Sequence, residues 1–162
     1  MPARSEAFRA LYALEYSGVA TYAWQLLRDR ELADEVAQEA FTRLFSRWIS
    51  VREPRRYLYR ITTNLIRASW GNKLKQRELL HQMESDAASP RPTEDLAAAL
   101  AVRRAVESLP ERLRPVVLLH YYADLPVADV ALALNRPEGT VKRQLSEARN
   151  VLASQLEGAQ DA

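Results

Sequence analysis

Residues 127–156 read VADVALALNRPEGTVKRQLSEARNVLASQL, and they are the most informative part of the chain about its fold. Apolar residues recur at helical spacing on both sides of a short polar break, which predicts a short helix, a turn and a longer helix from about Pro137 to Gln155. The turn is Asn135-Arg136-Pro137, and asparagine tolerates the left-handed backbone that a tight interhelical turn requires. This order is the helix-turn-helix arrangement, whose second helix enters the major groove of DNA.

The second helix of this pair combines a buried stripe with a polar face. The residues expected inward are Val141, Leu145, Ala148, Leu152 and Leu156. The residues expected outward are Lys142, Arg143, Ser146, Arg149 and Asn150. Cationic and amide side chains suit phosphates and base edges, so this face predicts DNA binding. The pattern alone also fits an ordinary helical hairpin with a solvated basic face.

The rest of the chain also reads as helical, which predicts an all-α fold. Only four glycines occur among 162 residues. We expect two short helices that are separated near Gly18, a long amphipathic helix over residues 32–48, and a helix that begins at Pro54. Later, Thr93 can cap one helix and Pro110 can open another. The residues expected to be buried in these two helices are Leu96, Leu100, Val106, Leu109, Leu113, Val116, Val117 and Tyr121.

A polar, proline-rich stretch divides the chain. Residues 85–92 read SDAASPRP, without a large apolar residue, which is typical of a flexible linker. We therefore predict two small helical domains, residues 1–82 and 93–162, joined by a linker at residues 83–92. The alternative is a surface loop within a single domain.

The composition excludes several kinds of site. The chain has no cysteine, which excludes disulfides, thiolate metal ligands and cysteine nucleophiles. His81 and His120 lie far apart without a ligand-spaced partner, so no metal is expected. No run approaches the roughly 20 apolar residues of a membrane span, and the N-terminus lacks the apolar stretch of a signal peptide. We expect a cytoplasmic protein without membrane insertion.

Charge is unevenly distributed. Residues 52–77 contain eight basic side chains and one acid, whereas residues 29–41 contain five acids and one arginine. A basic block beside an acidic one indicates two different partners, one of them polyanionic. Cations combined with flat side chains hold single-stranded DNA. The cations in residues 46–67 that suit this role are Arg55, Arg56, Arg60 and Arg67, and the flat side chains are Trp48, Tyr57 and Tyr59. For Tyr57, simple core packing is an equal alternative.

Four ordered motifs resemble those of one family. GTVK at residues 139–142 resembles the family's "GTVKSRL" recognition helix, and LPERLR at residues 109–114 resembles its "LPERxR" motif. DEVAQEAF at residues 34–41 resembles "DLVQETF", and YLYRITTN at residues 57–64 resembles "WLYRIARN". Together they resemble an extracytoplasmic-function (ECF) sigma factor of the sigma-70 family, which is a subunit of bacterial RNA polymerase and not an enzyme. The resemblance spans about Phe8 to Leu156.

The resemblance implies a role for each half. The first half would be sigma region 2, a four-helix domain that binds core polymerase and recognises and melts the −10 element. The second would be sigma region 4, the helix-turn-helix domain that recognises the −35 element. The acidic helix, which by itself reads as a solvated face, would dock on the largest polymerase subunits, with Phe41, Phe45 and Trp48 in the core. Residues 49–54 would clasp one flipped base near Asn64.

The implied site residues form three sets. The set for core polymerase is Asp34, Glu35, Gln38 and Glu39. The set for −10 DNA is Arg55, Arg56, Tyr57, Arg60, Asn64 and Arg67. The set for −35 DNA is Lys142, Arg143, Ser146 and Arg149.

Three residues depart from the family pattern. Glu147 stands where a DNA-contacting arginine is common, and an acid facing DNA repels phosphate but can accept a hydrogen bond from cytosine N4. Asp124 and Pro126 replace the small residue and the capping serine of the motif. We expect either low affinity for the −35 element or an unusual −35 sequence.

The sequence therefore predicts an alternative sigma factor that binds core polymerase and directs initiation at specific promoters. A different helix-turn-helix regulator, acting without core polymerase, would account for residues 109–156 but not for the first half. A helical adaptor that binds only protein is a third hypothesis, and an enzyme is disfavoured because the sequence shows no nucleophile–base pair or phosphate loop. No cofactor or small-molecule substrate is expected. The expected partners are core polymerase and promoter DNA, and an anti-sigma factor is a further candidate.

Overall fold

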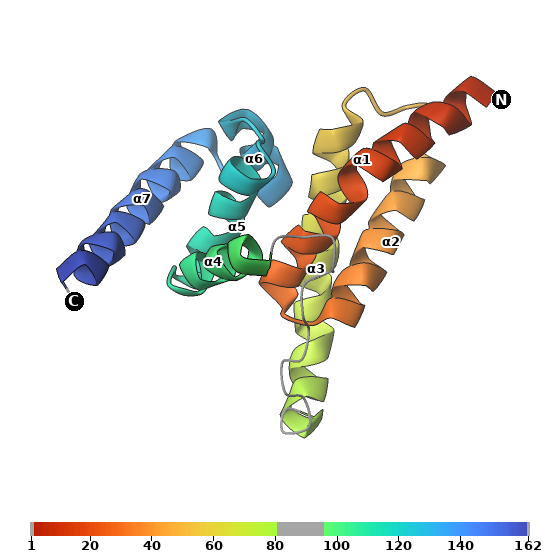
Figure 1. The fold of residues 1–162 in the computed structure, drawn as a ribbon. Helices are drawn as coiled ribbons and strands as arrows, with labels where there is room; N and C mark the ends of the chain where they lie inside the picture. The colour runs from red at the N-terminus through yellow and green to blue at the C-terminus, as the bar shows by residue number, and fades with distance from the viewer. Residues whose placement is uncertain (1, 81–95, 162) are drawn as a thin grey trace. The chain divides into compact units, whose positions relative to one another are not determined.

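The computed structural model describes residues 2–80 and 96–161, and all regular structure within these ranges is helical (Figure 1). The chain divides into two compact units, residues 1–89 and residues 90–162, called here the N-terminal and C-terminal units. The predicted linker at residues 83–92 and the predicted cap at Thr93 lie outside the described residues. The prediction of an all-α protein with two helical domains is confirmed.

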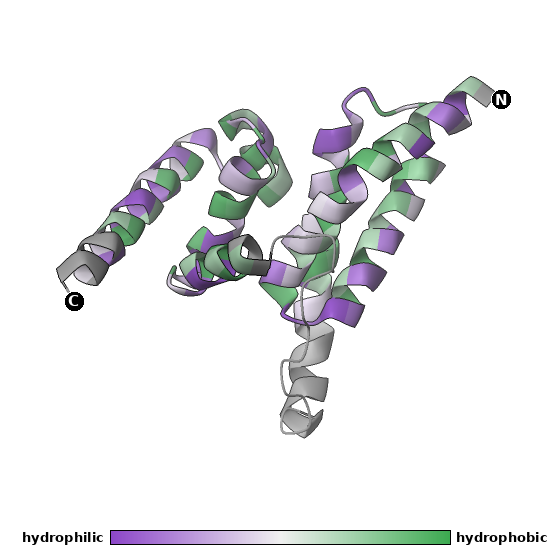
Figure 2. Ribbon diagram, in the orientation of Figure 1, coloured by the Kyte–Doolittle hydropathy of each residue, from purple (hydrophilic) through white to green (hydrophobic). Residues whose placement is uncertain are grey.

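The N-terminal unit consists, in its described part, of three helices that all contact one another: α1 (Pro2–Leu27), α2 (Arg30–Ser46) and α3 (Pro54–Leu80). Asp29 caps α2, because its Oδ1 accepts a hydrogen bond from the Leu32 N–H at 3.0 Å. The predicted start of α3 at Pro54 is confirmed. Figure 2 shows hydrophilic and hydrophobic residues alternating around α2, as an amphipathic helix requires. The central buried side chains are Val19, Tyr22, Ala37, Ala40, Leu44, Leu58 and Ile66.

The predicted break near Gly18 is wrong, because α1 continues through it. A Cβ atom at Gly18 would lie 3.1 Å from the Tyr59 hydroxyl oxygen, so the glycine allows α3 to approach α1 closely. Next to it, the hydroxyls of Tyr22 and Thr63 form a buried hydrogen bond of 2.9 Å. Tertiary packing thus overrides the low helix propensity of glycine, and the expected four helices of this unit become three in its described part.

Of the three aromatic residues expected in the core near the end of α2, one is buried. Phe41 is buried, as expected, but Phe45 is 54% exposed and Trp48 lies in a turn beyond the end of the helix. Phe8 of α1 packs edge-on against all three, with ring centroids 4.9 Å away for Phe45 and 5.4 Å away for Trp48. The expectation that Phe45 belongs to the core is wrong.

The C-terminal unit begins, in its described part, with α4 (Leu96–Glu107) and ends with α6 (Val127–Leu134) and α7 (Glu138–Asp161). Between them the chain forms a 3₁₀ turn, η1 (Glu111–Leu113), a short α5 (Arg114–Val117) and a π-helical turn, η2 (Leu118–Tyr122). The π turn contains a hydrogen bond from the Ala123 N–H to the Leu118 carbonyl, five residues back. This wider turn changes the helical register. Tyr121 is consequently 48% exposed, so its predicted burial is wrong, as is that of Leu100 on α4.

The helix-turn-helix forms where the sequence predicts it. Asn135 ends α6 in the left-handed conformation, with φ 55° and ψ 48°, which confirms the predicted turn. Asp124 also has a left-handed backbone, and Pro126 precedes α6 without a side-chain cap. The predicted inward stripe of α7 is confirmed for its first three residues, and its fourth is partly buried. The residues of α7 with these placements are Val141, Leu145, Ala148 and Leu152. The side chain of Leu156, the fifth, lies outside the described part of the chain.

Candidate nucleic-acid and polymerase interfaces

The outward face of α7 is exposed, as predicted. The buried stripe of the helix holds it on the core of the C-terminal unit, and the polar residues point away from that core. The exposed residues are Lys142, Arg143, Ser146, Arg149 and Asn150. A helix face that carries three cations, a hydroxyl and an amide can donate to phosphate oxygens and to base edges.

The two arginines of this face are held differently. Arg149 Nη1 donates a hydrogen bond to the Tyr121 hydroxyl at 2.9 Å, so the exposed tyrosine of η2 fixes the direction of this guanidinium. Arg143, by contrast, makes a long contact of 3.5 Å with Thr140 Oγ1 on its own helix. Tyr121 was expected in the core, and sequence periodicity misses its contact because the π turn changes the register.

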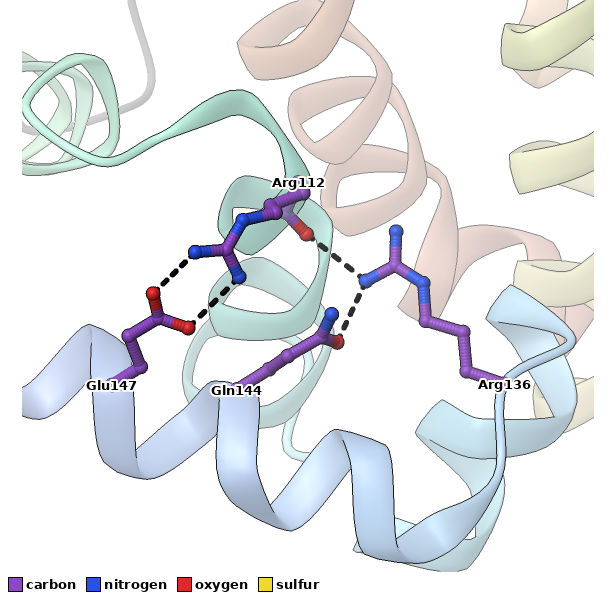
Figure 3. Close-up of polar contacts among 4 residues, drawn as sticks. All are labelled: Arg112, Arg136, Gln144 and Glu147. Carbon is purple, nitrogen blue, oxygen red and sulfur yellow. Dashed lines mark hydrogen bonds and ion pairs between the residues drawn. The ribbon is translucent and has the colours of Figure 1, made fainter.

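Glu147 is paired with an arginine that the sequence analysis did not include in the site. Arg112 of η1 donates from Nη1 to Glu147 Oε2 at 2.8 Å and from Nη2 to Glu147 Oε1, so the contact is bidentate (Figure 3). The hydrogen bond from Arg112 lowers the pKa of the Glu147 carboxyl, and the same bond raises the pKa of the Arg112 guanidinium. Both groups are therefore charged at neutral pH.

A second arginine reinforces this contact. Arg136, in the turn between α6 and α7, donates from Nη1 to the Arg112 carbonyl at 2.9 Å and to Gln144 Oε1 at 2.8 Å. Figure 3 shows Gln144 and Glu147 projecting from α7 toward these two arginines. One flank of α7 is thus tied to η1 through four side chains.

The exposed face of α3 carries most of the predicted −10 set. Arg60, Asn64 and Arg67 are exposed and follow one another at steps of four and three residues, so they form a single stripe. Arg56 and Tyr57 lie at the start of this stripe and are partly buried. The stripe presents cations and an amide along about three helical turns.

Two residues of the predicted −10 region, Tyr59 and Arg55, do not belong to this exposed stripe. Tyr59 is only 1% exposed and packs against Tyr22, so it offers no surface for stacking a base, and that interpretation is wrong. Arg55 Nε donates to Glu15 Oε1 at 2.9 Å, and its guanidinium lies over the Tyr59 ring at 5.4 Å. Because Glu15 is itself nearly buried, Arg55 anchors α3 to α1.

The polar face of α2 is supported by two tyrosines of α1 that the sequence analysis did not select. Gln38 Nε2 donates to the hydroxyls of Tyr12 at 3.1 Å and Tyr16 at 3.3 Å, and the Tyr16 hydroxyl donates to Asp34 Oδ1 at 3.3 Å. The two tyrosines are four residues apart and therefore lie on one face of α1, and this spacing could have identified them from the sequence. Glu35 and Glu39 are exposed, and Glu39 accepts a hydrogen bond from Arg43 on its own helix at 2.9 Å.

Comparison with known families agrees with this architecture. Residues 11–74 match the family described as Sigma-70 region 2, and residues 99–152 match the family described as Sigma-70, region 4. The ECF RNA polymerase sigma factor SigW of Bacillus subtilis is 29% identical over 152 residues, covering 82% of this chain and 80% of SigW. The RNA polymerase sigma-E factor of Streptomyces coelicolor is 27% identical over 135 residues, covering 82% of this chain and 76% of that protein.

A solved structure shows the same fold. The sigma factor RpoE, in a co-crystal with the anti-sigma factor NepR from Bartonella quintana, superposes with a TM-score of 0.71 at 19% identity, covering 94% of this chain and 98% of RpoE. No helix in the described ranges is long and apolar enough to cross a membrane.

Two helical units, one ending in a helix-turn-helix with a cationic recognition helix, define a DNA-binding protein of the transcription machinery. Within that class, the chain belongs to the sigma-70 family as an ECF sigma factor. It directs promoter-specific transcription initiation with RNA polymerase, as a non-enzymatic subunit.

Proposed function

We propose that the two units divide promoter recognition between them. The N-terminal unit binds core polymerase through α2 and the unwound −10 element through α3, and the C-terminal unit binds the −35 element through α7. The observation that carries this proposal is that each unit presents an exposed polar helix face over an apolar core of its own.

The proposed polymerase contact is the polar face of α2, formed by Asp34, Glu35, Gln38 and Glu39. Asp34 and Gln38 are already oriented by the α1 tyrosines, so less side-chain freedom is lost when this face docks. The acidic character of the face suits a basic or amide-rich partner surface, as expected for a contact that is not with DNA.

The proposed −10 contact is the stripe on α3. Arg56, Arg60 and Arg67 would bind phosphates, Asn64 would bind an extruded base, and Tyr57 would stack on one. Arg55 is the weakest member of the predicted set, because its guanidinium is paired with Glu15. The partly exposed Trp48 and the exposed Ile49 adjoin this region in sequence, so residues 49–54 remain the proposed clasp for a flipped base.

The proposed −35 contact is the exposed face of α7, with Lys142, Arg143, Ser146 and Arg149. Arg143 lies near the helix N-terminus, which is the part of a recognition helix that reaches base edges, so we assign it to base reading. Arg149 lies more than one turn further on and is directed by Tyr121, which suits a phosphate contact.

An anti-sigma factor is a further proposed partner. The structural neighbour RpoE is bound by the anti-sigma factor NepR in its co-crystal structure, and the shared fold supports an analogous partner here. The cytoplasm is the proposed location, because core polymerase and promoter DNA are found there.

In vitro transcription with purified core polymerase and genomic DNA tests the proposed function. We expect start sites whose upstream sequences share one −10 and one −35 element. Replacing Asp34 and Gln38 by arginine should cancel the net negative charge of the docking face and place two cations against a partner surface expected to be basic, so core affinity should fall at least about tenfold.

The matched control is Ser5→Arg combined with Glu6→Arg, which makes the same change in charge at exposed positions of α1. Normal core binding by the Asp34→Arg, Gln38→Arg variant would contradict the docking assignment. Sequence-specific DNA binding by the wild-type chain, without any binding to core polymerase, would favour the alternative of an independent helix-turn-helix regulator.

A further inference from the structure

Arg112 lies beside the recognition helix without belonging to it. It comes from η1, which precedes both helices of the helix-turn-helix, and its guanidinium reaches Glu147 on the flank of α7. Ser146, the neighbour of Glu147, belongs to the proposed −35 face. The exposed edge of that face therefore includes a cation from another element of the C-terminal unit.

Both the backbone and the side chain of Arg112 are fixed by hydrogen bonds. Its backbone carbonyl accepts a hydrogen bond from Arg136, and its guanidinium is bound by both carboxylate oxygens of Glu147 (Figure 3). Gln144 accepts from the same Arg136 nitrogen, so consecutive turns of α7 fix the position of η1. A side chain whose position is fixed before binding loses little conformational freedom when it meets a ligand.

Arg112 retains donors for another acceptor. A guanidinium has five N–H groups, and the bidentate contact with Glu147 uses two of them. The Arg112 side chain is 53% exposed, so the remaining N–H groups are accessible to a phosphate oxygen. Arginine binds phosphate through this planar arrangement of donors.

The pair also changes the electrostatics of Glu147. A lone carboxylate on this flank would repel DNA phosphates, whereas the ion pair has no net charge. The hydrogen bond from Arg112 lowers the pKa of the Glu147 carboxyl, so the ion pair persists further into the acidic range than a lone glutamate would stay ionised. Loss of Arg112 would remove a donor and at the same time expose an uncompensated acid.

We propose that Arg112 is a phosphate-contacting residue of the −35 interface and that Glu147 is its positioning residue, which reads no base. This inference rests on the proposed −35 role of α7. It replaces the expectation that Glu147 itself faces DNA and weakens the interface or reads a cytosine.

The test measures binding of the holoenzyme, reconstituted from core polymerase and the full chain, to a promoter duplex mapped by in vitro transcription. A duplex with a scrambled −35 element serves for comparison, and both are titrated over a salt series. Arg112→Gln should weaken binding to both duplexes by about tenfold, as for loss of one charged hydrogen bond, and lower the salt slope by about one. Arg104→Gln, the same change at an exposed position of α4, should leave binding unchanged.

The substitution Glu147→Gln tests whether Glu147 acts by orienting Arg112 or as an unpaired acid that repels DNA. With Arg112 present, the substitution should weaken binding, because the guanidinium loses its orientation. In the Arg112→Gln background it should strengthen binding, because an unpaired acid is removed. The wild type, the two single variants Arg112→Gln and Glu147→Gln, and the double variant should all show the same −35 base preference.

The proposal is overturned if Arg112→Gln binds DNA normally, if Glu147→Gln has the same effect in both backgrounds, or if Glu147→Gln alters base preference. Arg143→Ala separates this outcome from failure of the proposed function. If Arg143→Ala weakens binding and Arg112→Gln does not, only the present inference fails. If neither variant weakens binding, α7 does not face DNA. Far-UV circular dichroism of each variant establishes that the fold is retained.

Discussion

Two tyrosine hydroxyls determine how Asp34 and Gln38 are presented on α2. Tyr12 and Tyr16 lie one turn apart on α1, with ring centroids 5.0 Å from each other, and Tyr16 contacts both polar residues. The buried Phe41 of α2 packs against this pair, with its ring centroid 4.8 Å from that of Tyr12. The hydroxyls therefore occupy fixed positions at the base of the proposed polymerase contact.

Removing these hydroxyls should weaken core binding without unfolding the protein. The double substitution Tyr12→Phe, Tyr16→Phe keeps the ring packing and deletes the hydrogen bonds, each of which contributes about 0.5–1.5 kcal/mol. We expect core affinity, measured by titration of labelled core polymerase, to fall about three- to tenfold. Tyr121→Phe, which removes a hydroxyl from the C-terminal unit, is the matched control. Unchanged affinity in the double variant would show that orientation of Asp34 and Gln38 is irrelevant to docking.

On α7, the exposure of residues could be predicted from sequence, but their partners could not. The outward face of α7 was predicted because helical periodicity determines which side chains leave the core. The contacts of Glu147 with Arg112 and of Arg55 with Glu15 join residues 35 and 40 positions apart. Such contacts depend on how elements pack, which the local spacing of charges does not encode.

Among the elements, two local features explain two of the predictions that failed, the break at Gly18 and the burial of Tyr121. Gly18 was interpreted as a break, but it lies inside α1 where the Tyr59 hydroxyl approaches. The π turn at η2 exposes Tyr121, whereas a regular helix with 3.6 residues per turn would place this side chain inward. In contrast, Asn135 and Pro54 were predicted correctly, because each acts through its own backbone preference.

The left-handed turn at Asn135 gives a direct test of this backbone argument. Asn135→Ala should destabilise the C-terminal unit by about 1–2 kcal/mol relative to Asn135→Gly, because a Cβ without a polar group is disfavoured at φ 55°. Denaturant unfolding followed by far-UV circular dichroism measures the difference. Asn150→Ala removes the same side chain from the exposed face of a regular helix and should not destabilise the unit. Equal stability of the Asn135→Ala and Asn135→Gly variants would contradict the role assigned to the turn.

At the scale of the whole molecule, each unit closes an apolar core of its own. Leu44 is fully buried in the N-terminal unit, and Leu145 is buried in the C-terminal unit, as are Val141 and Ala148. The aromatic residues are divided unequally between the units. All three tryptophans, Trp24, Trp48 and Trp70, belong to the N-terminal unit, whereas the C-terminal unit contains tyrosine but no tryptophan.

This division predicts that two spectroscopic signals will report different unfolding events. Tryptophan fluorescence should follow only the N-terminal unit, while far-UV circular dichroism follows the helices of both units. Leu145→Ala removes buried methyl groups at a cost of about 2–5 kcal/mol, so it should lower the midpoint seen by circular dichroism and leave the fluorescence midpoint in place. Leu44→Ala should instead lower the fluorescence midpoint. If Leu145→Ala shifts both signals equally, the chain unfolds as a single cooperative structure, and independent action of the two units at the −10 and −35 elements would lose its thermodynamic basis.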